Sequence, residues 1–252
     1  MSDRLTALHD SVDRLSELVT GLDPDTLTAF AYPTEWSVAD VLFHLGSGAV
    51  ILLRRLDDGL AGVETPDDAS RVVWDQWDAK SPEDQAADAL VADRALLDRL
   101  EGLNDDERER FTFAMGPMTF DVDDFVGLRL NEHALHVWDV EVVLDPAAPI
   151  APGSVAPVVD NLALFAGFTS KPTGTERVVT VVTTEPRRGF VVTLAADKVT
   201  LEPTDPSDAP DLVIPAEAFV RLVYGRLNPD HTPQVEGDDG VLDELRRAFP
   251  GG

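Results

Sequence analysis

The segment from residue 122 to residue 144 carries ionisable side chains where a helix should be apolar. At about 100° per residue, one face of this predicted helix combines large apolar residues with ionisable ones around Glu132. The apolar members of this face are Phe125, Leu128, Leu135 and Val143, and the other ionisable members are Arg129, His136 and Asp139. Because burying an unpaired charge is costly, these groups should be ion-paired, hydrogen-bonded or bound to a metal.

Glu132 and His136 are four residues apart, a spacing that lets two helical side chains chelate one cation. The pattern is similar to the paired histidines of zinc proteases, but glutamate comes first and no His-Glu-x-x-His motif is present. Two alternatives remain open. In the first, Arg129 and Glu132 form an ion pair. In the second, His133 and His136, three residues apart, are the pair that chelates the cation. His133 points about 100° away from Glu132, which favours a packed or interdomain histidine.

His44 lies on a second predicted helix and is a candidate for a third ligand. Ser47 and Gly48 share its side of that helix, and their small size leaves room for a ligand. A histidine from a facing helix would complete a three-ligand metal centre with an open position, as helix bundles build them. The alternative is a surface histidine or a hydrogen-bonded core histidine.

Composition excludes several classes of function. The 252 residues include 47 acidic and 20 basic ones, and the net charge of −27 argues against nucleic acid and anionic membranes as partners. No apolar run approaches the roughly 18 residues of a membrane span, and the N-terminus lacks a secretory signal pattern. We therefore expect a cytoplasmic protein. The chain has no cysteine, so any sulfur chemistry would need an external thiol.

The first half of the chain predicts four helices and so a four-helix bundle with at least one crossover connection. The first helix ends near Gly21, and the others cover residues 38–59, 82–103 and 122–144. A polar loop with Pro66 precedes the third helix, and Trp74 and Trp77 in it are expected to be lids or packing anchors. Tyr32 is a further aromatic candidate for a pocket border.

The second half has a different character and predicts an α+β domain. A helix over residues 155–168 precedes four strand candidates, at 177–184, 190–194, 199–201 and 211–214, and then two helices, at 215–225 and 241–249. We expect a small antiparallel sheet. The Pro-rich residues 146–152 suggest a linker, so the predicted domains are 1–148 and 149–252.

Two segments resemble the mycothiol-dependent maleylpyruvate isomerase family, within the wider DinB-like metalloenzyme superfamily. They are Trp36-Ser-Val-Ala-Asp-Val-Leu-Phe-His44-Leu and Arg129-Leu-Asn-Glu132-His-Ala-Leu-His136-Val-Trp-Asp139, and the likeness extends over nearly the whole chain. The resemblance implies a DinB-like four-helix domain followed by a small α+β domain similar to sterol carrier proteins. It implies His44, Glu132 and His136 as metal ligands, with zinc as the metal.

The resemblance also implies the chemistry. A thiol bound to zinc is deprotonated, so mycothiol would add to the cis double bond of a maleyl-type substrate. Rotation and loss of the thiolate would give the trans, fumaryl product. An S-transferase would share the first step. The family uses an arginine of the second domain near the site, so the resemblance makes Arg221 and Arg226 candidates for that residue. Any of Arg129, Arg221 and Arg226 could hold a substrate carboxylate.

Other interpretations remain open at this stage. Arg221 and Arg226 would otherwise be solvated arginines at a helix end. A DinB-like zinc hydrolase would work without a thiol, and a non-enzymatic protein would bind a small molecule or lipid. Asp139 is a candidate for orienting a ligand histidine. The expected assembly is a monomer or a homodimer.

Overall fold

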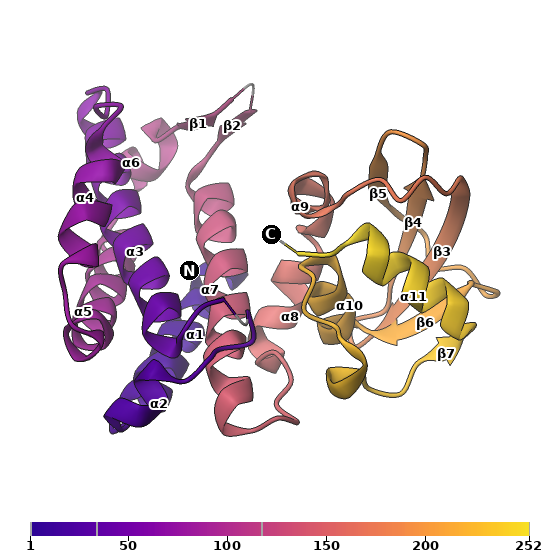
Figure 1. Ribbon diagram of the computed structural model, residues 1–252. Helices are drawn as coiled ribbons and strands as arrows, with labels where there is room; N and C mark the ends of the chain where they lie inside the picture. The colour runs from indigo at the N-terminus through magenta and orange to yellow at the C-terminus, as the bar shows by residue number, and fades with distance from the viewer. Residues whose placement is uncertain (1, 34, 117, 252) are drawn as a thin grey trace. The chain divides into compact units, whose positions relative to one another are not determined.

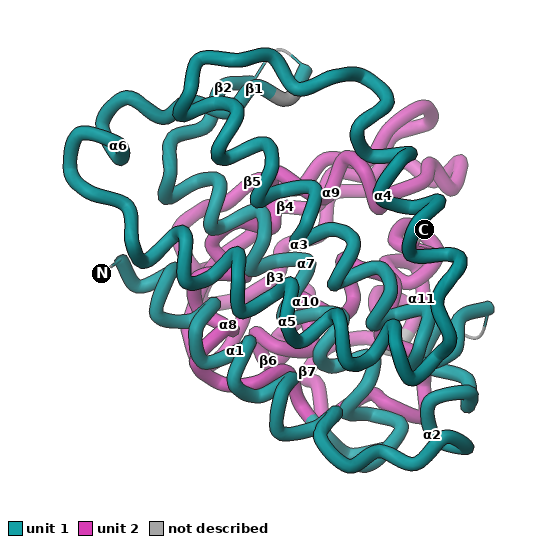
Figure 2. The backbone as a smooth tube through the Cα atoms, turned by 90° about the vertical axis from the view of Figure 1, so that its left-hand side faces the viewer, with its two compact units in different colours: residues 1–148 teal, residues 149–252 magenta. Residues whose placement is uncertain are grey.

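The computed structural model describes residues 2–33, 35–116 and 118–251. The chain divides into two compact units, residues 1–148 and 149–252, which Figure 2 shows in different colours. The first unit is helical apart from one short hairpin. The second carries a mixed β-sheet with helices.

Four long helices make up most of the first unit and coincide with the four helical segments expected from the sequence. They are α1 (Asp3–Val19), α3 (Val38–Ala61), α5 (Pro82–Glu101) and α7 (Val122–Leu144). Helices α1 and α3 each pack against both α5 and α7, so the four helices enclose a common core (Figure 1). The apolar stripes of α1 and α5 face this core, where Leu15 and Leu100 are fully buried.

Helix α7 is buried on almost every side. Seventeen of its 23 residues are buried, including polar ones on several faces. This differs from the one-sided apolar stripe that the sequence suggested. A helix that is buried all round needs a partner for each polar side chain it carries.

The start of α3 is set by local sequence and determines where His44 lies. Ser37 caps the helix as predicted: its hydroxyl accepts a hydrogen bond from the backbone N–H of Asp40 at 3.1 Å. The carboxylate of Asp40 accepts one from the backbone N–H of Ser37 at 2.8 Å. This capping box fixes the first turn, so His44 comes about two turns into the helix.

Shorter elements connect the long helices. They are α2 (Pro24–Thr28), α4 (Ala69–Asp78), α6 (Asp105–Arg110), β1 (Phe113–Met115) and β2 (Met118–Phe120). Helix α4 replaces the loop expected before α5. The reason is tertiary packing, because Trp77 is buried and lies edge-on to Phe43 of α3. Trp77 is thus a packing anchor, whereas Trp74 is 47% exposed.

The second unit contains a five-stranded sheet in the order β5-β4-β3-β6-β7. Its strands are β3 (Arg177–Thr184), β4 (Arg188–Leu194), β5 (Val199–Thr204), β6 (Leu212–Pro215) and β7 (Glu236–Gly237). Strands β3 and β6 pair in parallel, so the sheet is mixed and the expectation of an antiparallel sheet was wrong for this pair. The chain leaves β5 and returns on the far side of β3, in the same direction as β3.

Helices complete the second unit. They are α8 (Pro152–Val159), α9 (Leu162–Thr169), α10 (Ala216–Val223), the 3₁₀ turn η1 (Pro229–His231) and α11 (Asp239–Ala248). The helix expected over residues 155–168 is divided in two at Asp160, whose carboxylate is held by the guanidinium of Arg188 at 2.6 and 3.0 Å. Phe190 of β4 packs on Phe219 of α10, with ring centroids 5.0 Å apart.

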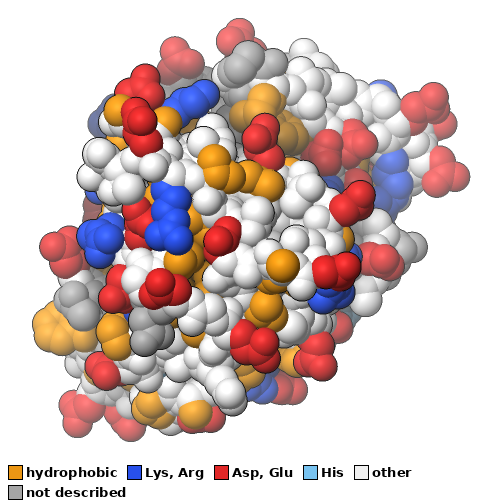
Figure 3. All heavy atoms as spheres, turned by 90° about the vertical axis from the view of Figure 1, so that its right-hand side faces the viewer, with side chains coloured by type: hydrophobic (Ala, Val, Ile, Leu, Met, Phe, Trp, Pro, Cys, Tyr) orange, Lys and Arg blue, Asp and Glu red, His pale blue; other side chains and the backbone are white. Residues whose placement is uncertain are grey.

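Among the helices of residues 2–33, 35–116 and 118–251, none has the length and apolar character needed to cross a membrane. The face drawn in Figure 3 has acidic side chains over its whole extent and fewer basic ones between them. This distribution agrees with the net charge of −27.

The close approach of α3 and α5 depends on Gly46. A Cβ added there would lie 2.1 Å from Cη2 of Trp77 and 2.8 Å from Cα of Ala89. We expect Gly46→Ala to lower the free energy of unfolding of the first unit by about 1–3 kcal/mol, because overpacking must displace α4 or α5. Urea denaturation followed by tryptophan fluorescence measures this, since all four tryptophans lie in residues 1–148.

Gly167→Ala is the control for this prediction. In α9 of the second unit, an added Cβ meets no atom within 4 Å. The fluorescence midpoint should stay unchanged in this variant. An equally unchanged midpoint in Gly46→Ala would contradict the packing argument.

Candidate metal centre

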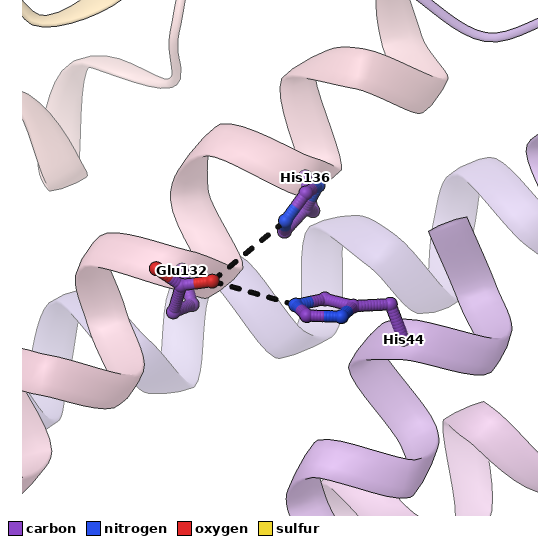
Figure 4. Close-up of side chains that lie close together, drawn as sticks. All are labelled: His44, Glu132 and His136. Carbon is purple, nitrogen blue, oxygen red and sulfur yellow. Dashed lines mark hydrogen bonds and ion pairs between the residues drawn. The ribbon is translucent and has the colours of Figure 1, made fainter. Parts of the chain in front are cut away.

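Three side chains from two helices meet in the first unit and form the group called here the ligand cluster: His44 of α3, and Glu132 and His136 of α7. Figure 4 shows them pointing toward one another, with dashed lines that run from the carboxylate of Glu132 to each of the two imidazoles. Oε2 of Glu132 lies 3.4 Å from Nε2 of His44 and 3.8 Å from Nε2 of His136. One candidate ligand atom of each residue lies within 4.8 Å of the others.

These separations suit a single divalent cation. Zinc–ligand bonds of about 2.0 Å at tetrahedral angles place the ligand atoms about 3.3 Å apart. A ligand set of two imidazole nitrogens and one carboxylate oxygen is typical of catalytic zinc sites, which keep a fourth position open. The side chains of His44 and Glu132 are 42% and 41% exposed, so one side of the ligand cluster is accessible to solvent.

Asp139 orients one of the two histidines. Its carboxylate is fully buried and lies 2.8 Å from Nδ1 of His136. An imidazole whose Nδ1–H donates to a carboxylate presents the lone pair of Nε2 to a metal. The Nε2 atom of His136 is the one that faces Glu132. Asp139 therefore occupies the position of a carboxylate that supports a metal-bound histidine.

Trp36 forms an aromatic wall beside the ligand cluster. Its ring stacks on His136, with centroids 5.8 Å apart and planes 16° from parallel. It also lies 5.4 Å from the ring of His44. Sequence reasoning did not assign Trp36 a role, although it directly precedes the cap residue Ser37 and so had to lie at the start of α3.

The electrostatics of Glu132 favour its charged form. Burial raises the pKa of this carboxyl, but the hydrogen bond with His44 and the nearby His136 outweigh burial, so its pKa lies below the ordinary value. Glu132 is therefore a carboxylate at neutral pH and can serve as an anionic ligand. Two neutral imidazoles and one carboxylate leave a bound divalent cation with a net positive charge.

The charge of Arg129 helps to lower the pKa of Glu132, but its guanidinium is bonded to other groups. Its side chain is 3% exposed, and its guanidinium pairs with Asp93 of α5 and donates to the carbonyl oxygen of Leu45 at 3.0 Å. The ion pair with Glu132 that the sequence left open is replaced by this pair with Asp93. The surroundings of Arg129 favour a structural role over contact with a substrate. His133 is also packed inside the first unit, where it is fully buried.

The two arginines considered in the second unit have different surroundings. Arg221 is buried, donates to both carboxylate oxygens of Glu217 at 2.8 and 2.9 Å, and reaches the carbonyl oxygen of His231 at 2.8 Å. Arg226 is half-buried and donates to the carbonyl oxygen of Tyr224 at 2.9 Å. Arg221 thus ties α10 to η1, and Arg226 has more of its side chain accessible.

Sequence reasoning missed Asp93, although the signal for it was present. Asp93 lies on the apolar stripe of α5, four residues after Ala89 and three before Leu96. It is 2% exposed. An acidic residue on an apolar stripe is the same signal that drew attention to Glu132. Tyr32, a candidate for the pocket border, packs on Trp138 with ring centroids 4.9 Å apart.

Comparison with known proteins identifies the family. Residues 8–141 match the family model described as the mycothiol maleylpyruvate isomerase N-terminal domain. Crystal structures of the mycothiol-dependent maleylpyruvate isomerase and of a histidine-to-alanine mutant of it share the fold, with TM-scores of 0.63 and 0.62 at 17% and 16% identity. In each comparison 92% of both chains is covered. No curated protein sequence matches the chain. Because the family model covers more than half of its length, the chain belongs to the mycothiol maleylpyruvate isomerase family.

Proposed function

We propose that this protein is a metal-dependent isomerase that uses mycothiol to convert maleylpyruvate-type substrates from the cis to the trans form. The observation that carries the proposal is the convergence of His44, Glu132 and His136, with one side accessible, in a chain of this family. In the ligand cluster these residues would hold one divalent cation, and the two imidazoles favour zinc over magnesium or calcium.

A bound zinc ion supplies the Lewis acidity that makes a thiol ionise near neutral pH. The residues around it have separate tasks. Asp139 keeps the Nδ1 proton on His136, and Trp36 covers the face of the His136 imidazole and excludes water from that side. The accessible side, next to Glu132 and His44, admits the thiol and the substrate.

The absence of cysteine from the chain requires the thiol to come from outside. In the isomerisation, a carbon–sulfur bond forms as the cis double bond becomes single. Rotation follows, and the same carbon–sulfur bond then breaks to regenerate the thiol and a trans double bond. No group is transferred overall, so mycothiol acts as a cofactor.

An arginine is the natural partner for the substrate carboxylates. We assign this role to Arg226 rather than Arg221, because Arg221 is buried whereas Arg226 is half-buried. Arg129 is not retained for this role, because it is buried against Asp93.

We further propose that the two units are separate domains, with boundaries at 1–148 and 149–252. The first would be a DinB-like four-helix bundle, consistent with the packing of α1, α3, α5 and α7 around one core. The second would be related to sterol carrier proteins.

The thiol requirement tests the proposed reaction. We expect zinc-loaded protein to isomerise maleylpyruvate only when mycothiol is added, measured by the change in ultraviolet absorbance between the cis substrate and the trans product. Glutathione at the same concentration is the control thiol. Accumulation of a stable thioether would indicate an S-transferase. Turnover of a hydrolysable substrate without any thiol would indicate a hydrolase, and either result would overturn the proposal.

The ligand assignment is tested by metal content. We expect His44→Ala to lose stoichiometric zinc after purification in metal-containing buffer, because two remaining ligands hold zinc weakly. His9→Ala is the matched control, since His9 is a half-exposed helical histidine bonded to Glu101 at 2.7 Å. Metal analysis by atomic emission should give one zinc per chain for the wild type and the control. Full occupancy in His44→Ala would be incompatible with the assigned site.

Substitutions of the two arginines of the second unit should have different effects. Arg226→Gln is expected to raise the KM for maleylpyruvate about 10-fold or more, because one charge-assisted hydrogen bond to the substrate is lost. Arg221→Gln should destabilise the second unit by about 3 kcal/mol or more, because Glu217 loses the partner of a buried ion pair. Steady-state kinetics and denaturation followed by circular dichroism distinguish them. The opposite pattern would transfer the substrate role to Arg221.

A further inference from the structure

A second polar cluster lies inside the first unit, apart from the ligand cluster. Its members are Ser11 of α1, Asp93 of α5, and Arg129 and His133 of α7, and we call it the core network. Each member is 3% exposed or less. Charged residues this deeply buried need an explanation, because their transfer from water is costly.

The members of the core network are bonded in a chain. Arg129 pairs with one carboxylate oxygen of Asp93, and Nε2 of His133 lies 3.2 Å from the other. Nδ1 of His133 lies 2.8 Å from the hydroxyl of Ser11. Burial lowers the pKa of His133, against the opposing charge of Asp93, so the imidazole is neutral. Its Nε2–H then donates to Asp93, and Nδ1 accepts from the Ser11 hydroxyl.

The residues Ser11, His133 and Asp93 are those of a nucleophilic triad, but this arrangement cannot act as one. Ser11 is 2% exposed and His133 is fully buried, so no substrate can reach the hydroxyl. The core network therefore has a structural task, and its connections show which elements it joins.

The core network touches α3 next to a proposed metal ligand. The guanidinium of Arg129 donates to the carbonyl oxygen of Leu45, the residue after His44, at 3.0 Å. It also lies against Gly48, where an added Cβ would be 3.4 Å from Nη1 of Arg129. On α7, Arg129 comes one turn before Glu132, and His133 directly follows Glu132. A slide or rotation of α7 that separated Glu132 from His44 would also break these bonds.

A contribution to stability does not by itself explain why the core network consists of polar residues. Replacing a buried ion pair by apolar residues of similar volume is often neutral or stabilising. The better attested use of buried polar groups is to select one register among several that apolar packing would allow. Bonds from α7 to α1, α3 and α5 at one level of the core meet that requirement.

We propose that the core network sets the register of α7 against α3 and so holds Glu132 and His136 at chelating distance from His44, with Asp93 as its central positioning residue. The inference rests on the metal site proposed above. Asp93 itself bonds only Arg129 and His133 among the contacts described here, so it acts through them on the ligands.

The test removes the network without leaving unpaired buried charge. In the variant Ser11→Ala/Asp93→Leu/Arg129→Met/His133→Leu, all four polar members become apolar. We expect the metal-free protein to keep a thermal midpoint close to that of the wild type. Its Kd for zinc, measured by competition with a chelator, should rise about 10- to 100-fold, the usual effect of losing outer support of metal ligands. The visible spectrum of the cobalt-substituted protein should change as well, because it reports coordination geometry.

Two further variants complete the experiment. Arg14→Met/Glu141→Leu is the matched control, since that ion pair joins α1 to α7 without bonding α3. It should leave both zinc affinity and the cobalt spectrum unchanged. Asp93→Leu/Arg129→Met removes both members of the buried ion pair together and so leaves no buried charge unpaired. It should weaken zinc binding in the same direction, and it gives the result if the fourfold variant does not fold.

The outcomes distinguish the two proposals. A folded network variant with wild-type zinc affinity and cobalt spectrum would overturn the positioning role and leave the metal site standing. A wild-type protein that binds no zinc or cobalt would overturn both. Equal weakening in the Arg14/Glu141 control would show a general effect of altering the core and would also overturn the positioning role.

Discussion

The first unit depends on the pairing of charged side chains inside its central helix. Helix α7 is buried on nearly all sides, yet its buried residues include an arginine, two histidines and acidic side chains. Each such group is tolerable only with a partner, because an isolated buried charge costs several kcal/mol. Asp93 satisfies Arg129 and His133, and Asp139 satisfies His136. Glu132 alone retains an accessible carboxylate beside two imidazoles, the arrangement that a cation would complete.

The same constraint explains why the chemistry proposed here needs outside components. Imidazole and carboxylate oxygen bind a metal but offer no thiolate, and the chain contains no cysteine. A site with three protein ligands and one accessible side can accept an external thiol. The aromatic face of Trp36 and the carboxylate of Asp139 restrict the motion of His136 from two directions. In the proposed reaction the protein would contribute geometry and charge, and the cation and the thiol would contribute reactivity.

Structural similarity to the isomerase persists at 16–17% identity. The fold therefore tolerates extensive replacement, which is expected where apolar volume and pattern are preserved. The second unit illustrates how residues close together in the sequence can have different constraints. Arg221 is enclosed by Glu217 and the His231 carbonyl, whereas Arg226, five residues later, is only half-buried. The spacing of the two arginines in the sequence does not distinguish them.

Local sequence determined the long helices, the cap at Ser37 and the common face of Glu132 and His136, because helical periodicity places residues four apart on one side. Only the tertiary structure decided which groups meet across helices. Asp93 is 36 residues from Arg129, and their contact depends on how α5 lies along α7, which no spacing within either helix specifies. Tertiary packing also decided that α4 forms in place of a loop and that β3 pairs in parallel with β6. Periodicity acts within one element, whereas burial and partner choice are set by the packing of several.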